Sequence, residues 1–283
     1  EYPLDDEADP ELFIKSGVIR NKDLSKIEPI DPSKITEQVA HSWYDYEGGD
    51  SEALHPSQGQ TNPNYTGPEP PFERLDTANG YSWLKSPRYD GQPMEVGPLA
   101  RMLVNYAQGH EKVQGLVNYV LETLGVGPEA LFSTLGRVAA RGIETQLLVD
   151  KIGDFVDELA DNMGKGELRI HDNSKWDPET WPKDSMGAGF HEAPRGALGH
   201  WVHVKDAKIA RYQCIVPSTW NAGPRDAGDT PGPYEAALVG TPVADPEQPI
   251  EILRTVHSFD PCMACGVHVV EPGGREVTRV KAR

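Results

Sequence analysis

Apolar residues recur at helical spacing most clearly in the middle of this chain. From residue 97 onward they occupy positions i, i+3 and i+4, the pattern of an amphipathic helix. This pattern predicts two helices followed by a longer one, which is kinked near Gly142 and ends near Gly164. The apolar positions are Leu99, Met102, Leu103 and Tyr106, then Val113, Leu116, Val117, Val120 and Leu121, then Leu131, Leu135, Val138, Ile143, Leu147, Ile152, Phe155, Val156 and Leu159. We interpret these stripes as the core of a helix bundle.

The other segments predict loops and short strands. Residues 1–95 are punctuated by Pro and Gly and have an irregular pattern, and residues 165–190 form a polar loop. Two extended runs, 198–204 and 209–216, predict a β-hairpin, and a last helix is expected over about 249–258. The fold class is therefore α+β and mainly helical: a helix bundle with small peripheral antiparallel β elements and long loops.

Composition narrows the partners of this chain. Its 283 residues include 28 Gly and 25 Pro, and only 37% are apolar, so we expect a small core that needs surface from another polypeptide. The net charge is −17 and no basic stripe is present, which argues against a nucleic-acid partner. No run of 18 apolar residues occurs, so no membrane span is expected within the chain.

Two of the three cysteines lie close together near the end, at Cys262 and Cys265, with His268 three residues later. Thiolates select soft or borderline cations, and imidazole extends the choice to nickel, zinc, copper and iron. A Cys-x-x-Cys pair is also compatible with a redox dithiol, half of a zinc site, or two buried cysteines without a function. A tetrahedral zinc site of Cys214, Cys262, Cys265 and His268 would use every cysteine and make the chain a stapled structural protein.

Four blocks of sequence favour one of these interpretations. They are residues 260–268 (DPCMACGVH), 86–101 (SPRYDGQPMEVGPLAR), 191–198 (HEAPRGAL) and 212–221 (YQCIVPSTWN). The first matches Asp-Pro-Cys-x-x-Cys-x-x-His, the C-terminal signature of the large subunit of nickel-iron hydrogenases. With all four blocks in the right order, the chain resembles that subunit along almost its whole length, and most closely the membrane-bound uptake type. The resemblance implies the C-terminal part of the large-subunit fold.

The resemblance implies a set of metal ligands. Cys262 corresponds to a terminal nickel ligand, and Cys265 to the thiolate that bridges nickel to an iron carrying cyanide and carbon monoxide. His268 and the backbone carbonyl of Cys214 correspond to ligands of a structural magnesium. We therefore expect Cys214 to act through its carbonyl, with its thiol a small buried side chain.

The resemblance also implies residues around the open metal position. Arg195 corresponds to an arginine above it, and Asp260 to the carboxylate that pairs with this arginine. A guanidinium is almost never neutral, so we expect Arg195 to have a positioning role and the thiolate of Cys262 to exchange protons. A purely structural ion pair is the alternative. Pro217 and Ser218 correspond to the pocket that surrounds the diatomic ligands of the iron.

The chain departs from the family pattern in having no second Cys-x-x-Cys motif, which the N-terminal half of the subunit supplies. We expect residues 1–268 to be the C-terminal portion of a longer subunit; a separate chain that completes the site is the alternative. Residues 269–283 correspond to an extension that a maturation endopeptidase removes between His268 and Val269. An ordinary solvated terminus is the other interpretation of these residues.

The implied function is heterolytic oxidation of H2. Electrons would pass to an iron-sulfur small subunit, since too few thiols remain here to hold a cluster. The partner would place the complex on the periplasmic face of the cytoplasmic membrane; a cytoplasmic location is the alternative. Two other functions stay open: a zinc-stapled, non-catalytic interaction subunit of the same fold, and a quinone-binding subunit of a related energy-converting complex that has lost the metals. The retained cysteines argue against the second.

Overall fold

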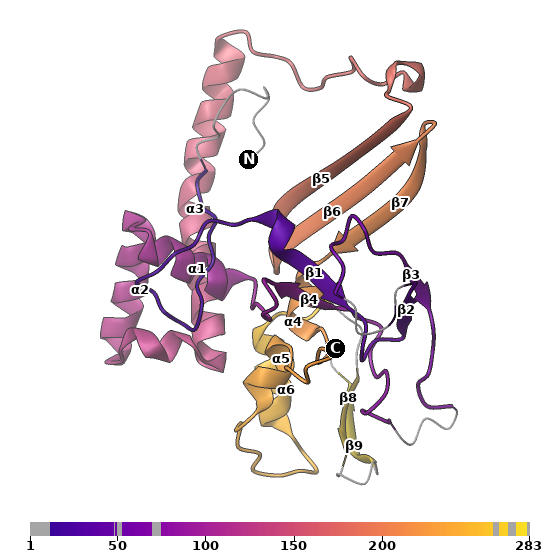
Figure 1. The fold of residues 1–283 in the computed structure, drawn as a ribbon. Helices are drawn as coiled ribbons and strands as arrows, with labels where there is room; N and C mark the ends of the chain where they lie inside the picture. The colour runs from indigo at the N-terminus through magenta and orange to yellow at the C-terminus, as the bar shows by residue number, and fades with distance from the viewer. Residues whose placement is uncertain are drawn as a thin grey trace. The chain divides into compact units, whose positions relative to one another are not determined.

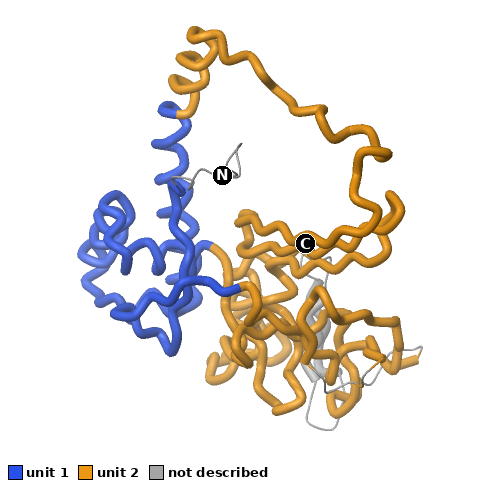
Figure 2. Tube along the Cα trace, turned by 45° about the horizontal axis from the view of Figure 1, so that its top comes forward, with its two compact units in different colours: residues 1–31, 98–154 blue, residues 32–97, 155–283 orange. Residues whose placement is uncertain are grey.

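The computed structural model describes residues 12–47, 49, 53–69 and 75–262, together with the backbone of the strands Gly266–Val270 and Glu276–Lys281. The chain divides into two compact units (Figure 2). Unit 1 contains Glu1–Asp31 and Pro98–Asp154, and unit 2 contains Pro32–Gly97 and Phe155–Arg283. In the part of the chain that the structure describes, no helix has both the length and the apolar composition that crossing a membrane requires.

Unit 1 is built on the predicted helices. They are α1 (Pro98–Ala107), α2 (Glu111–Leu124), the 3-10 turn η2 (Pro128–Leu131) and α3 (Thr134–Gly164), which continues into unit 2. The ends of α2 have local causes. The ring of His110 accepts a hydrogen bond from the N–H of Val113, and Gly125 ends the helix in the left-handed conformation, at φ 64°. Leu131, expected in the long helix, belongs to η2 instead.

The apolar stripes of α1 and α2 form a buried core, as predicted. This core contains Leu99, Met102, Leu103, Val113, Val117, Leu121, Leu131, Ala140, Ile143 and Leu147. Inside it, Arg101 donates two hydrogen bonds to Glu144, and both side chains are about nine-tenths buried. The helix-bundle interpretation is thus confirmed for Ile143 and Leu147 of α3.

The same interpretation is wrong for several apolar positions of α3. The side chains that were expected in the core but are exposed are Leu135, Val138, Ile152, Phe155, Val156 and Leu159. Helix α3 has 31 residues and continues through Gly142, so it is roughly 46 Å long, whereas the 14 residues of α2 span roughly 21 Å. Helices α1 and α2 are too short to cover the whole of α3. An apolar stripe in the sequence does not show which part of a helix its neighbours cover.

Unit 2 contains four small antiparallel sheets, counted over the described residues, and three short helices. The strand pairs are β1 (Ile35–Gln38) with β4 (Ser86–Tyr89), β2 (Tyr44–Tyr46) with β3 (Thr61–Pro63), and β8 (Gly266–Val270) with β9 (Glu276–Lys281). The largest sheet has the order β5 (Asp184–Ala193), β6 (Gly196–Lys205), β7 (Lys208–Ile215). The helices are α4 (Pro217–Ala222), α5 (Pro233–Leu238) and α6 (Ile250–Ser258), with the 3-10 turns Pro32–Lys34 and Pro178–Thr180 elsewhere.

The three strands β5, β6 and β7 lie side by side as a meander (Figure 1). The predicted hairpin of β6 and β7 is confirmed. Its turn residues Asp206 and Ala207 both have positive φ, 49° and 56°, as a two-residue hairpin turn requires. Strand β5, in contrast, begins within the segment that was predicted to be loop. Most of its residues are exposed, so it lacks the apolar alternation by which a strand is recognised.

A buried ion pair fixes the loop that follows α4. The Nε of Arg88, on β4, donates to Oδ2 of Asp226 at 2.8 Å, and its Nη2 donates to the carbonyl of Thr230 at 2.9 Å. The two charged side chains are only 1% and 7% exposed. This pair ties the loop of residues 223–232 to the sheet of β1 and β4.

Candidate metal centre

Three segments of unit 2 deliver the described residues of the predicted site. Arg195 lies in the two-residue turn between β5 and β6, where Ala193 and Gly196 are paired. Ser218 lies in the first turn of α4, which starts directly after β7 with Pro217 at its first position. Cys262 follows the end of α6. The site is therefore assembled from turns and helix ends that the sheet and α6 hold in place.

The structure brings Arg195 and Asp260 together, as the sequence predicted. The Nε of Arg195 donates to the backbone carbonyl of Asp260 at 2.9 Å and lies 3.4 Å from its Oδ2. Both side chains are partly exposed, at 37% and 42%, so the pair opens to a surface of this chain. Asp260 has φ 56°, a left-handed conformation that costs a non-glycine residue roughly 1–2 kcal/mol. Such strain is frequent at functional sites.

Cys262 lies next to Ser218. Its backbone N–H donates to Oγ of Ser218 at 3.4 Å, and its side chain is exposed. Ser218 is 6% exposed and Pro217 is also buried. A hydroxyl that accepts a hydrogen bond still has its own proton to donate. The structure thus clusters Arg195, Ser218, Asp260 and Cys262 through backbone contacts.

Cys214 lies on β7, opposite His200 of β6. Its thiol is half-buried rather than buried, and it contacts the hydroxyl of Tyr212 two residues earlier on the same face of the strand. Desolvation and this contact both raise the pKa of Tyr212. The Tyr212 hydroxyl is also hydrogen-bonded to Nδ1 of His200. The expectation of a buried thiol is wrong because the side chain points to the partly solvated face of a three-stranded sheet.

The remaining expected ligands lie outside the residues whose side chains the structure describes. Cys265 is outside the described residues, and His268 and Val269 are described only as backbone of β8. Among the described side chains, no group of three or more His, Cys, Asp and Glu residues could hold a metal ion. The roles assigned to these residues, and the boundary between 268 and 269, therefore remain predictions.

A buried polar cluster beside Cys214 was not predicted. The Oε2 of Glu37, on β1, accepts hydrogen bonds from Nζ of Lys85 at 2.7 Å and from Nε2 of Gln213 at 2.8 Å. Nε2 of Gln213 also lies 3.5 Å from the carbonyl oxygen of Cys214. Burial raises the pKa of Glu37, partly offset by Lys85 and Gln213, and its Oε1 has no hydrogen-bond partner among the described residues.

A signal in the sequence could have located Glu37. It stands between Ile35 and Val39 in an extended segment, so alternation puts all three on one face. The structure buries this face, with Val39 1% exposed and Glu37 fully buried. A carboxylate at an inward position needs a charged or polar partner, but only the fold shows which one.

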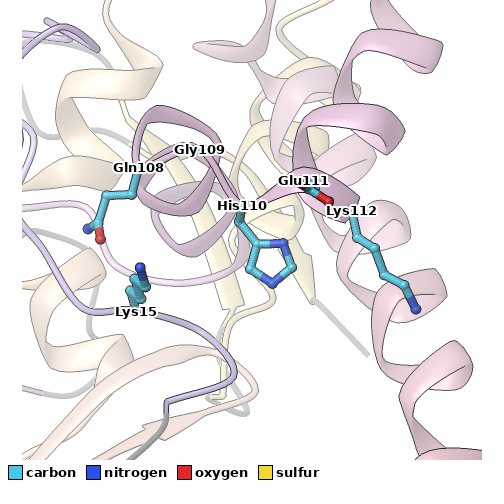
Figure 3. A pocket seen from close by; sticks show the side chains of 6 residues that line it. All are labelled: Lys15, Gln108, Gly109, His110, Glu111 and Lys112. Carbon is cyan, nitrogen blue, oxygen red and sulfur yellow. The ribbon is translucent and has the colours of Figure 1, made fainter.

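A surface pocket of about 340 Å3 lies in unit 1. The predicted site residues are distant from its lining residues in the sequence and belong to unit 2. It is lined by residues around the start of α2, and Figure 3 shows Lys15 and Gln108 on one side and Lys112 pointing away on the other. His110, which caps α2, also lines it. Because none of the candidate metal ligands lines this pocket, it has no part in the proposed centre.

Comparisons with known proteins agree with the resemblance. The sequence profile of the family described as nickel-dependent hydrogenase matches residues 1–268. The chain is 47% identical over 281 residues to the uptake hydrogenase large subunit of Bradyrhizobium diazoefficiens, covering 96% of this chain and 47% of that protein. It is 43% identical over 286 residues to the hydrogenase-1 large chain of Escherichia coli K12, covering 98% and 48%.

The fold is also similar to solved structures. One is the Ni-Fe-Se hydrogenase of D. vulgaris Hildenborough in the reduced state, with a TM-score of 0.70 and 35% identity. That match covers 92% of this chain and 50% of the other, and the predicted fold class is confirmed. The chain spans about half the length of the curated relatives it matches. From the profile, the identities and the fold together, this chain belongs to the nickel-dependent hydrogenase family.

Proposed function

We propose that this chain supplies two of the four thiolates, from Cys262 and Cys265, that hold nickel in an H2-oxidising hydrogenase large subunit. The observation that carries the proposal is the cluster in which the exposed Cys262 adjoins Ser218 and lies two residues from the Arg195–Asp260 pair. Relatives named uptake hydrogenase large subunit support the uptake direction. The rest of the large subunit would supply the other two thiolates, since the relatives are about twice as long.

The residues present suit such a centre. Exposed thiolates select soft or borderline metals, and Cys262 is accessible for metal insertion. Nickel and an iron with cyanide and carbon monoxide ligands, when bound, would polarise H2 between them. H2 is a very weak acid, so its heterolysis also needs a nearby base. The sulfur of Cys262 can take the proton, because a thiol has a pKa far closer to neutral than a guanidinium has.

Arg195 and Asp260 would then fix the geometry above the metals. Arg195 stays charged, and its hydrogen bond to the carbonyl of Asp260 restrains the backbone two residues before Cys262. Ser218 and Pro217 would line the pocket for the diatomic ligands. In this role Ser218 would accept from the Cys262 N–H and donate its own proton to a cyanide nitrogen.

Magnesium would lie at the carbonyl of Cys214 and the imidazole of His268. The neighbouring Glu37 supports a cation here, because its buried Oε1 has no hydrogen-bond partner among the described residues and Gln213 links its other oxygen to the Cys214 carbonyl. Hard oxygen donors suit Mg2+. Lys85 already pairs with Glu37, so we assign to this carboxylate the binding of water around the ion.

Further polypeptide would complete the molecule. The exposed apolar side of α3, including Val156 and Leu159, fits coverage by the rest of the large subunit. We also propose an iron-sulfur small subunit as electron acceptor, on the periplasmic face of the cytoplasmic membrane. A maturation endopeptidase would cut between His268 and Val269.

Metal analysis of the assembled complex tests the proposal. Changing Cys262 or Cys265 to Ser should abolish bound nickel and H2 uptake. The matched control is Cys214→Ser, which removes a thiol but keeps the backbone carbonyl, and it should retain nickel. Infrared bands of iron-bound cyanide and carbon monoxide should be present in the wild-type complex and the control. Nickel retained after loss of both cysteines would refute the assignment, and zinc in place of nickel and iron would favour the zinc-stapled alternative.

A further inference from the structure

Helix α4 contacts the segment that carries Cys262 and the segment that carries Val96. Its Ser218 accepts a hydrogen bond from the N–H of Cys262, and its Asn221 is hydrogen-bonded to the backbone of Val96. The two side chains are three residues apart, so they project from neighbouring positions on the surface of the helix. Ser218 is 6% exposed and Asn221 2% exposed. The proposed function uses Ser218 but gives Asn221 no role.

Asn221 binds one peptide segment through two hydrogen bonds. Its Oδ1 accepts from the N–H of Val96 at 3.0 Å, and its Nδ2 donates to the carbonyl of Val96 at 2.8 Å. This arrangement satisfies both backbone groups of a residue 125 positions away, as a neighbouring strand would. Replacement by Ala would leave both partly buried groups without this partner.

The segment that Asn221 holds packs directly against the turn that carries Arg195. A Cβ added to Gly97 would lie 2.8 Å from the carbonyl oxygen of Arg195, and one added to Gly196 would lie 2.7 Å from the N of Gly97. Both glycines have positive φ, 125° and 135°. The two backbones therefore approach closely at these glycines, where the Val96 side chain also packs against Gly196, and a shift of residues 96–97 would move the Arg195 turn.

We propose that Asn221 is a positioning residue: it holds Val96 and Gly97 against the Arg195 turn and thereby sets the place of the Arg195 guanidinium beside Asp260. Since Ser218 on the same helix holds Cys262, α4 fixes both sides of the cluster from one short rigid element. The expected effect of Asn221 on H2 turnover rests on the function proposed above. Its expected effect on the position of the Arg195 turn does not depend on that function.

A matched control exists in unit 1. Asn105 is fully buried and binds one residue in the same way, with Oδ1 accepting from the N–H of Lys15 at 2.9 Å and Nδ2 donating to its carbonyl at 3.1 Å. Asn105→Ala removes the same kind of contact from a part of the chain that contains none of the described site residues. It controls for loss of stability alone.

The test compares the assembled complex with the variants Asn221→Ala, Gly97→Ala and Asn105→Ala. Turnover is expressed per bound nickel, so that a low yield does not affect it. Displacement of a positioning group by about 1 Å can cost roughly 100-fold in rate, so we expect kcat to fall 10- to 100-fold in the first two variants, with KM for H2 changed less. The infrared bands of iron-bound cyanide should shift in these two variants and not in Asn105→Ala.

Hydrogen exchange of the amides of residues 195–197 gives a readout that needs no bound metal. It should become faster in Asn221→Ala and stay unchanged in Asn105→Ala. Wild-type exchange and wild-type kcat in Asn221→Ala would overturn the inference. Failure of both site variants to assemble, while Asn105→Ala assembles, would also overturn it, because the contact would then serve folding only. Absence of nickel from the wild-type complex would instead refute the proposed function and leave the exchange test valid.

Discussion

Replacing Arg88 with Met should open the loop after α4 without opening the rest of unit 2. Arg88 donates to Oδ2 of Asp226, to the carbonyl of Pro87 and to the carbonyl of Thr230, all at 2.8–2.9 Å. Removing one partner of a buried ion pair typically costs about 3–5 kcal/mol. Met refills the aliphatic volume and Asp226 keeps two backbone donors on its other oxygen, so we expect about 3 kcal/mol. This corresponds to roughly a 100-fold change in the opening equilibrium.

Hydrogen exchange of the amides of Gly228 and Thr230 in the assembled complex measures this change directly, because both amides donate to Oδ1 of Asp226. Protection of these amides should fall roughly 100-fold in Arg88→Met. The control is Lys26→Met, which removes an exposed pair whose atoms are 4.0 Å apart and should change stability by less than about 1 kcal/mol. Equal protection in Arg88→Met and wild type would show that the ion pair does not hold the loop.

Three further outcomes follow from the same structure. Burial alone would raise the pKa of Asp226, but the hydrogen bonds from Arg88 and from backbone amides outweigh it and lower the pKa. The stability from this group is present above the ordinary value of 3.8 and lost as the pH falls through the lower folded pKa. The protection factors of the loop amides, which correct for the slower intrinsic exchange in acid, should therefore fall in acid in wild type, and Asp226→Asn should remove that dependence. Leu147→Ala creates a cavity at a fully buried position of the α1–α3 core and should cost about 2–5 kcal/mol, measured by thermal unfolding of the complex; a cost below about 1 kcal/mol would contradict the packing. Val156 and Leu159 are both exposed, and changing both to Lys should lower the recovery of the assembled complex in a pull-down on the small subunit. Full recovery would show that no polypeptide covers this side of α3.

Local sequence determined the elements whose causes are local. The stripes of α1 and α2 predict their buried faces, because a helical repeat places every third or fourth residue on one side. The β6–β7 hairpin and the end of α3 at Gly164 were also predicted from neighbouring residues. The motif at 260–268 identified the family for the same reason, since its residue types and spacing are contiguous in the chain.

Only the tertiary structure decided features that depend on distant segments. Strand β5 has almost no buried residues, so its sequence has no apolar alternation that predicts a strand. Its strand conformation comes from pairing with β6. The exposed Val156 and Leu159 of α3 are as apolar as its buried Ile143 and Leu147, and only the packing of neighbouring helices decides which of them are covered. The contact of Asn221 with Val96 joins residues 125 positions apart, and a hydrogen bond between such distant residues leaves no periodic signal in the sequence.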